Sequence, residues 1–210
     1  MTITAPNCFR AACSMVTRSM YVISMMMLMT GCFTQQNQRN DDMDLFEQGE
    51  FLCLEQRWEE ARPVLREFLL NNPEHAGAHF YLGRAYLLAE DFRPAIAEGE
   101  FQTALHLFQR QGKVLPIERL ETPEYFEFIC HLDSAKVCYL EFSMRISIGA
   151  PPQALQPIAQ RGRAHMNAAL MLNTVPADYE MWDTNIRMIE QASGLLPRQR
   201  PSSSRNAAVH

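Results

Sequence analysis

The chain has 210 residues, enough for one domain with a substantial core and too few for two large domains. Hydrophobic residues make up 47% and charged residues 20%, a composition typical of a folded globular protein. The formal net charge of −5 argues against nucleic-acid binding, because the chain lacks the excess of basic residues that neutralises phosphates. No apolar run in the body of the chain reaches the length of a membrane-spanning helix.

The first 32 residues have the layout of a secretory signal. They contain no acidic side chain, carry Arg10 and Arg18, and continue through an apolar run at 20–29 into Thr30-Gly31-Cys32. A basic start, a short apolar segment and small residues before a cleavage point are the features of a signal peptide. We therefore predict that residues 1–31 form a signal peptide, with Met15 as an alternative start of translation.

The sequence Met29-Thr30-Gly31-Cys32 resembles the lipobox of bacterial lipoproteins, with Met where Leu is usual. The resemblance implies cleavage before Cys32, lipidation of Cys32 with palmitate, and residence at the periplasmic face of the cell envelope. Phe33 stands where lipoproteins of enteric bacteria retained at the inner membrane have Asp, which points to the outer membrane. An ordinary signal peptide or an uncleaved anchor is the alternative. Residues 32–41 are then a polar tether that spans about 30 Å at most.

Residues 42–109 contain the same 34-residue pattern twice. Glycines recur where two helices can approach closely, apolar residues recur at the expected helix contacts, and a proline follows the first unit. A period of this length is typical of helix-turn-helix solenoids. The residues that carry the pattern are Gly49, Leu52, Trp58, Ala61 and Pro73 in the first unit, and Gly83, Tyr86, Phe92 and Ala95 in the second.

This pattern resembles the tetratricopeptide repeat (TPR) family. The resemblance implies an all-α fold, a TPR-like α-solenoid of antiparallel helix pairs. The second unit departs from the family pattern at Gly99 and Gln102, so we expect its return helix to pack in a shifted register. The buried stripe of that helix is then predicted to be Phe101, Ala104, Leu105 and Phe108.

The rest of the chain predicts a third, irregular unit. Thr122 and Pro123 are good starting residues for a helix that should continue to residue 148. A partner helix is expected at 153–173 and a terminal helix at 178–193, so the helical domain covers 42–193. Residues 194–210 are rich in Pro, Arg, Ser and Asn, and we expect this tail to be disordered.

In TPR arrays the first helix of each unit lines a concave face that binds a partner. By this resemblance, the partner-binding groove consists of Phe46, Glu50, Phe80, Arg84 and Leu87. Two apolar anchors and a charged contact suit a protein or peptide segment, although Phe46 and Phe80 could equally be core residues. The chain is thus predicted to be a non-enzymatic scaffold or adaptor for an envelope protein, pilotin-like or with a role in envelope assembly. Another possibility is a structural subunit of a larger complex, with the convex face of the array or the helix at 123–148 as its interface.

A different class of function would use His75 and His79, beside Glu74. A small periplasmic metal-binding protein or enzyme is the alternative that these residues allow, but no cluster of further ligands completes a zinc site. We therefore predict no catalytic residue, no metal and no cofactor. Without the signal peptide, Cys53, Cys130 and Cys138 remain besides Cys32, and we expect all three to be small buried hydrophobes, although Cys53 could pair with one of the others.

Overall fold

The computed structural model describes residues 44–172 and 178–195, and these residues form helices and turns without any strand. The predicted signal peptide, Cys32, the polar tether and the tail from residue 196 lie outside the described residues. The chain divides into two compact units, Met1–Leu45 and Phe46–His210, and only residues 44 and 45 of the first are described. No helix among the described residues is long and apolar enough to cross a membrane.

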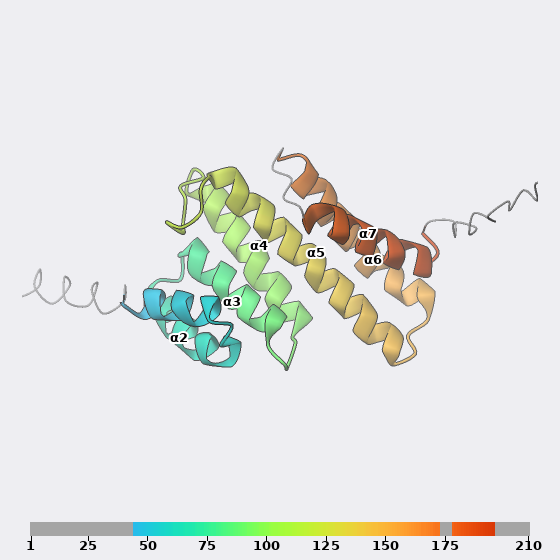
Figure 1. Cartoon of the computed structure of the whole chain (residues 1–210), viewed down its shortest axis with the longest axis horizontal. Coiled ribbons are helices and arrows are strands. Elements are labelled where there is room, and N and C mark those ends of the chain that lie inside the picture. The colour runs from blue at the N-terminus through green and yellow to red at the C-terminus, as the bar shows by residue number, and fades with distance from the viewer. Residues whose placement is uncertain (1–43, 173–177, 196–210) are drawn as a thin grey trace, which may run out of the picture. The chain divides into compact units, whose positions relative to one another are not determined.

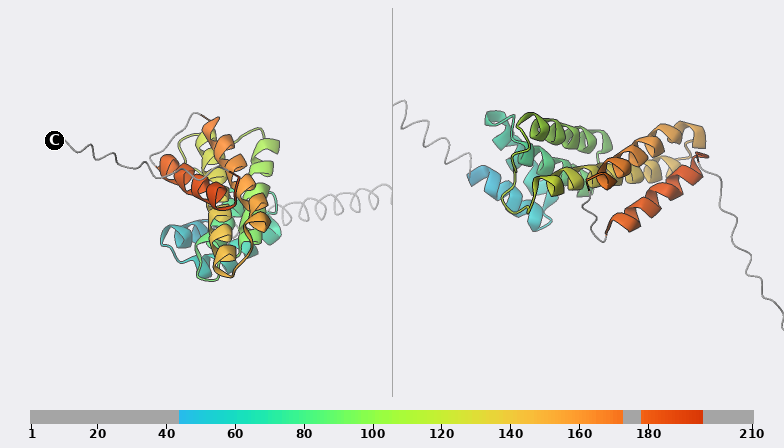
Figure 2. Two further views of the ribbon diagram at one scale, coloured as in Figure 1. Left: turned by 90° about the vertical axis from the view of Figure 1, so that its right-hand side faces the viewer. Right: turned by 90° about the horizontal axis from the view of Figure 1, so that it is seen from above.

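The second unit is a succession of helices, each packed against the next one along the chain (Figure 1). α5 also contacts α3 and α7, so it joins the N-terminal helices to the C-terminal ones. Figure 2 shows α2 and α3 at one end of this unit and α6 and α7 at the other. The helices are residues 44–54, of which 46–54 belong to this unit, α2 (Trp58–Asn71), α3 (Ala76–Leu88), α4 (Pro94–Arg110), α5 (Pro123–Ser147), α6 (Pro152–Leu170) and α7 (Asp178–Ala192).

The ends of α5 follow from local signals in the sequence. The Thr122 hydroxyl oxygen accepts a hydrogen bond from the Tyr125 backbone N–H at 3.1 Å, and Pro123 takes the first helical position, as predicted. The helix ends at Ser147, and Gly149 follows with a φ of +84°, a conformation that costs glycine little. α6 ends at Leu170, three residues before the predicted end.

Two glycines of the repeated pattern lie where neighbouring helices touch. A Cβ on Gly49 would lie 2.6 Å from Leu65 of α2, and a Cβ on Gly83 would lie 2.8 Å from the Phe101 ring of α4. Leu52 and Tyr86, three residues after each glycine, are each 6% exposed. The period of 34 residues therefore coincides with repeated close contacts between a helix and the helix that follows it.

The second 34-residue repeat differs from the first at Ala95, whose side chain is exposed rather than packed against a neighbouring helix. Ala61, the fourth residue of α2, is fully buried, and the fourth residue of α4 is Ala97, also fully buried. α4 begins at Pro94, two positions later than the repeat implies, because Pro94 occupies the first turn, where a missing N–H costs nothing. The prediction of a shifted register is confirmed, and the predicted stripe is buried: Phe101, Ala104, Leu105 and Phe108.

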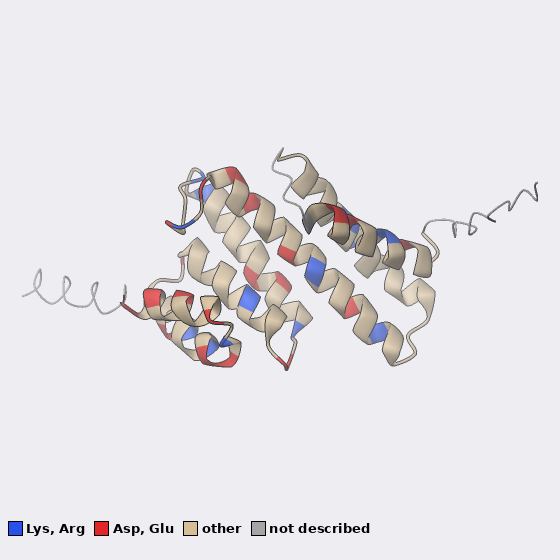
Figure 3. Ribbon diagram, in the orientation of Figure 1, with Lys and Arg blue, Asp and Glu red and all other residues tan. Residues whose placement is uncertain are grey.

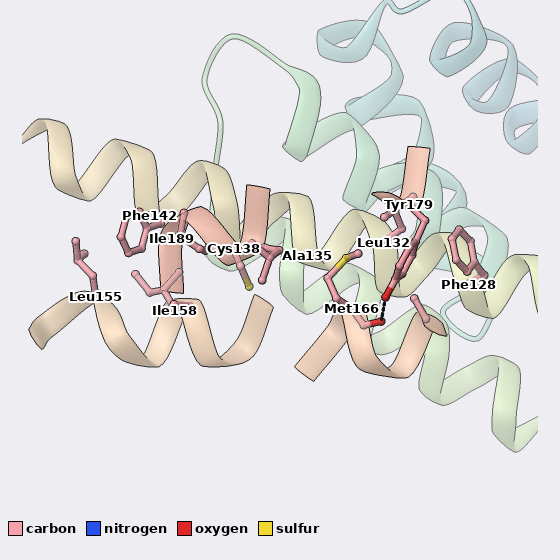
Figure 4. Close-up of a cluster of buried hydrophobic side chains, with 13 residues drawn as sticks. Phe128, Leu132, Ala135, Cys138, Phe142, Leu155, Ile158, Met166, Tyr179 and Ile189 are labelled. Carbon is pink, nitrogen blue, oxygen red and sulfur yellow. Dashed lines mark hydrogen bonds between the residues drawn. The ribbon is translucent and has the colours of Figure 1, made fainter. Parts of the chain in front are cut away.

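The interior has an aromatic centre and a second cluster toward the C-terminus. The Phe80 ring lies 5.9 Å from that of Phe101 and 5.6 Å from that of Phe126, which joins α3, α4 and α5. Figure 4 shows the second cluster, in which side chains of α5, α6 and α7 meet and the Tyr179 hydroxyl donates a hydrogen bond to the Met166 carbonyl.

The three described cysteines are free and buried, as expected for small hydrophobic side chains. Burial raises the pKa of the Cys53 and Cys138 thiols to about 12, so neither is a ready nucleophile.

The two helical glycines Gly83 and Gly99 give a matched test of this packing. Gly83→Ala should lower the free energy of unfolding by about 1–3 kcal/mol, because its methyl group overlaps the Phe101 ring. Gly99→Ala should raise it by up to about 1 kcal/mol, because a Cβ there meets nothing within 4 Å and alanine favours the helix. Urea unfolding of both variants measures the two changes, and equal effects would contradict the packing described.

Candidate functional site

The predicted groove residues separate into interior and surface groups. Phe46, Phe80 and Leu87 are only 7%, 2% and 3% exposed, and the Phe46 ring packs against the rings of Phe68, His75 and Tyr81. For Phe46 and Phe80 the structure therefore favours the core alternative. Among the predicted groove residues, Arg84 offers the largest polar surface, with 35% of its side chain exposed.

Arg84 is held on a surface made by α2, α3 and α5. Its Nε atom lies 3.5 Å from Asp133 Oδ2, and its guanidinium lies over the Trp58 and Phe80 rings at 6.0 and 5.7 Å from their centroids. Cation–π contacts of this kind orient a guanidinium without using its N–H donors. The Nε–H is buried and makes no hydrogen bond within the described residues, so its contact with Asp133 is a longer ion pair.

Charged side chains continue this surface toward the C-terminal helices. Lys136 Nζ lies 2.7 Å from Asp133 Oδ1 and 5.5 Å from the centroid of the Trp182 ring on α7. We call Arg84, Asp133 and Lys136, with Trp58 and Trp182 beside them, the charged stripe. Figure 3 shows how acidic and basic residues are interspersed along α5.

Glu50, the remaining predicted groove residue, is almost fully buried beside this surface. The Tyr81 hydroxyl donates a hydrogen bond to Glu50 Oε1 at 2.8 Å, and Arg119 Nε lies 3.6 Å from the same oxygen. Burial and the Glu50 carboxylate both raise the pKa of Tyr81, so the phenol keeps its proton and remains a donor. Glu50 thus acts as a hydrogen-bond acceptor that fixes Tyr81.

A separate ionic network lies where α4, α5 and α6 meet. Arg161 Nη2 lies 2.8 Å from Glu141 Oε2, and its Nε lies 3.1 Å from Glu98 Oε1. Arg145 Nη2 contacts the other oxygen of Glu141 at 2.6 Å. The network lines a pocket of about 370 Å³ together with Ala95, Gly99 and Gln102. The departures from the repeat at Gly99 and Gln102 therefore coincide with an open space beside α4.

Two histidines adjoin this network and are poor proton acceptors. His131 Nδ1 and His165 Nδ1 lie 3.3 Å apart. Burial, with the nearby charges of His131 and Arg161, lowers the pKa of His165 to about 4. Burial raises the pKa of the Glu98 carboxyl in the same network, because it disfavours the charged form.

The side chains of His75 and His79 both take part in contacts within the fold. His75 Nδ1 accepts a hydrogen bond from the Ala78 N–H at 3.0 Å and so caps α3. The two ring nitrogens of His79 contact Glu100 Oε2 at 2.6 Å and the Pro73 carbonyl at 2.9 Å. No group of His, Cys, Asp and Glu side chains in the described residues is arranged to hold a metal ion.

Sequence reasoning missed Asp133, Lys136 and Trp182 as parts of one surface with Arg84, and it missed the pairing of Glu98 and Glu141 with Arg161. One signal was present in the sequence: acidic residues interrupt a helix that is otherwise apolar on several faces, where they need cationic partners.

Comparisons with known proteins add no assignment, because the chain matches no protein-family model, no curated protein and no solved structure.

The buried histidine pair predicts a stability that depends on pH. His165 has an ordinary pKa of 6.5 in the unfolded chain and about 4 in the folded one. As the pH falls, the unfolded chain therefore protonates His165 before the folded chain does, which favours unfolding. The free energy of unfolding should fall by roughly 3 kcal/mol from this source as the pH falls from 6.5 toward 4. Urea unfolding at several pH values should show a shallower acid loss for His165→Gln. The exposed His106→Gln is the control, and an unchanged slope for His165→Gln would contradict the prediction.

Proposed function

We propose that this chain is a non-enzymatic scaffold that binds a protein partner in the bacterial envelope and is anchored to a membrane through a lipid on Cys32. The fold we propose for it is a TPR-like solenoid of antiparallel helix pairs with an irregular C-terminal unit. Two features support that fold: consecutive helices pack in chain order, and Gly49 and Gly83, one period apart, each lie against the following helix.

The observation that carries the binding proposal is the state of Arg84. Its guanidinium is oriented by two aromatic rings and by the ion pair with Asp133, and 35% of the side chain remains exposed. Asp133 pairs with the buried Nε of Arg84, while 35% of the Arg84 side chain is exposed, so the accessible part of the cation can pair with an oxygen of a partner. We infer that a partner places a backbone carbonyl or a carboxylate against Arg84.

The wider charged stripe supports an extended or helical peptide as the partner. Arg84 and Lys136 both lie beside Trp side chains, and Asp133 stands between them as an anion. Arginine and tryptophan are the residues that contribute most often to the energetic centres of protein interfaces. Because both cations are already positioned, little side-chain entropy remains to be lost when a partner binds.

The location in the cell is proposed from the sequence at residues 1–33. A basic start, an apolar run and the lipobox-like end at Cys32 support export and lipidation, and Phe33 supports the outer membrane. A tether of about ten residues would hold the helical domain near the periplasmic surface of that membrane. A pilotin-like role or a role in envelope assembly suits such an adaptor.

Replacing Arg84 should reduce partner binding with little effect on folding. We expect Arg84→Gln to lower partner recovery about tenfold, the effect of losing one charge-assisted hydrogen bond. Crosslinking in intact cells followed by affinity isolation and mass spectrometry measures the recovery. Asp133 keeps Lys136 as its partner in this variant, so the fold should remain intact, which circular dichroism checks.

Arg187→Gln is the matched control for that experiment. Arg187 is an exposed arginine on α7, and its Nε lies 2.8 Å from Asp183 Oδ2. Equal recovery of the partner with wild type and Arg84→Gln would refute the assignment of Arg84, and equal losses with both variants would indicate a nonspecific effect of charge.

The membrane anchor has a test of its own. Cys32→Ala should release the chain from the membrane fraction, because no cysteine remains at the lipobox-like position to carry the lipid. Fractionation of cell envelopes with immunodetection measures the distribution. Membrane association that persists unchanged in Cys32→Ala would contradict the lipid anchor and favour an uncleaved N-terminal segment.

A further inference from the structure

A second pocket, of about 300 Å³, lies between α2, the end of α3 and the turn before α4. It shares no residue with the charged stripe or with the ionic network of α4, α5 and α6. The residues that line it are Glu59, Arg62, Pro63, Arg66, Tyr86, Asp91 and Arg93.

Two of its arginines are fixed in place by one carboxylate. Arg62 Nη1 lies 2.7 Å from Asp91 Oδ1, and the Arg62 guanidinium lies 5.2 Å from the centroid of the Tyr86 ring. Arg93 contacts the other oxygen of Asp91 through Nη2 at 3.1 Å and Nε at 3.2 Å. The Arg62 side chain is only 15% exposed, so this guanidinium is held firmly at the wall of the pocket.

The third arginine has no anionic partner. Arg66 lies one helical turn after Arg62 on α2, and no hydrogen bond or ion pair joins its side chain to the rest of the described chain. Glu59 also lines the pocket, but its Oε1 accepts a hydrogen bond from the Glu90 backbone N–H at 3.1 Å. The pocket therefore gathers three guanidinium groups against two carboxylates, in a chain whose formal net charge is −5.

We propose that this pocket binds the phosphate group of a small molecule. Arginine is suited to phosphate because its N–H donors match pairs of phosphate oxygens, and three arginines that line one pocket from two segments suit a tetrahedral dianion better than a planar carboxylate. The volume lies within the range of small-molecule sites, so the rest of a compact ligand fits beside the phosphate. Tyr86 supplies an apolar wall, and Asp91 orients two donors without neutralising the third arginine.

Isothermal titration calorimetry of the purified full-length chain tests this site. The ligands are inorganic phosphate and phosphoserine, with acetate as the carboxylate comparison, at constant ionic strength and about pH 7.5, where phosphate monoesters are largely dianions. We expect saturable binding of both phosphates below about 10 mM and at least tenfold weaker binding of acetate. No saturable phosphate binding in this range, or equal binding of acetate, would overturn the proposal.

Variants separate this pocket from the general charge of the protein. Arg66→Gln should weaken phosphate binding about tenfold while leaving the fold intact, because Arg66 is exposed and has no partner within the described chain. Arg145→Gln, in the other pocket, should leave phosphate binding unchanged. Equal weakening by both variants would refute a site at Arg62, Arg66 and Arg93. Binding to phosphatidylglycerol vesicles without binding of soluble phosphate would also overturn the proposal and indicate a membrane surface instead.

Discussion

The contact between the Phe101 ring and the backbone of Gly83 determines how the remaining helices are arranged. A Cβ at Gly83 would lie 2.8 Å from this ring, so Phe101 reaches α3 only because that position is glycine. From there Phe101 contacts Phe80, which also contacts Phe126 of α5. One close approach between α3 and α4 thus creates the aromatic interior on which α5 packs, and α6 and α7 pack in turn on α5.

Because other helices cover α5 on more than one side, several of its charged side chains have little exposure to solvent. Asp133 and Glu141 are nearly buried, and each has two cationic neighbours at the line where α5 meets another helix. A carboxylate taken from water is tolerated only when paired in this way. The charged stripe and the ionic network are therefore consequences of one constraint, the burial of a long helix that carries acids.

The periodicity of the sequence predicted some of the helix contacts, and the others depended on the residue at which each helix begins. The period of 34 residues correctly placed Gly49, Gly83 and Tyr86 at helix contacts. It placed Ala95 wrongly, because the proline at residue 94 delays the start of α4 and moves the buried alanine to Ala97. For the proposed binding surface, the resemblance to the repeat family pointed to Arg84 but could not reach Asp133 or Trp182, which lie outside the clear repeats.

The sequence by itself determined that the chain is helical, where α5 begins, and which glycines permit close packing. These properties are local, since capping, proline geometry and hydrophobic periodicity act within a few residues. Only the tertiary structure decided that Phe46 and Phe80 face the interior and that Arg84 is the most exposed of the predicted groove residues. It also decided which charges meet, as with Arg62, Asp91 and Arg93. Contacts between residues far apart in the chain depend on the angles at which whole helices pack, and no single segment encodes those angles.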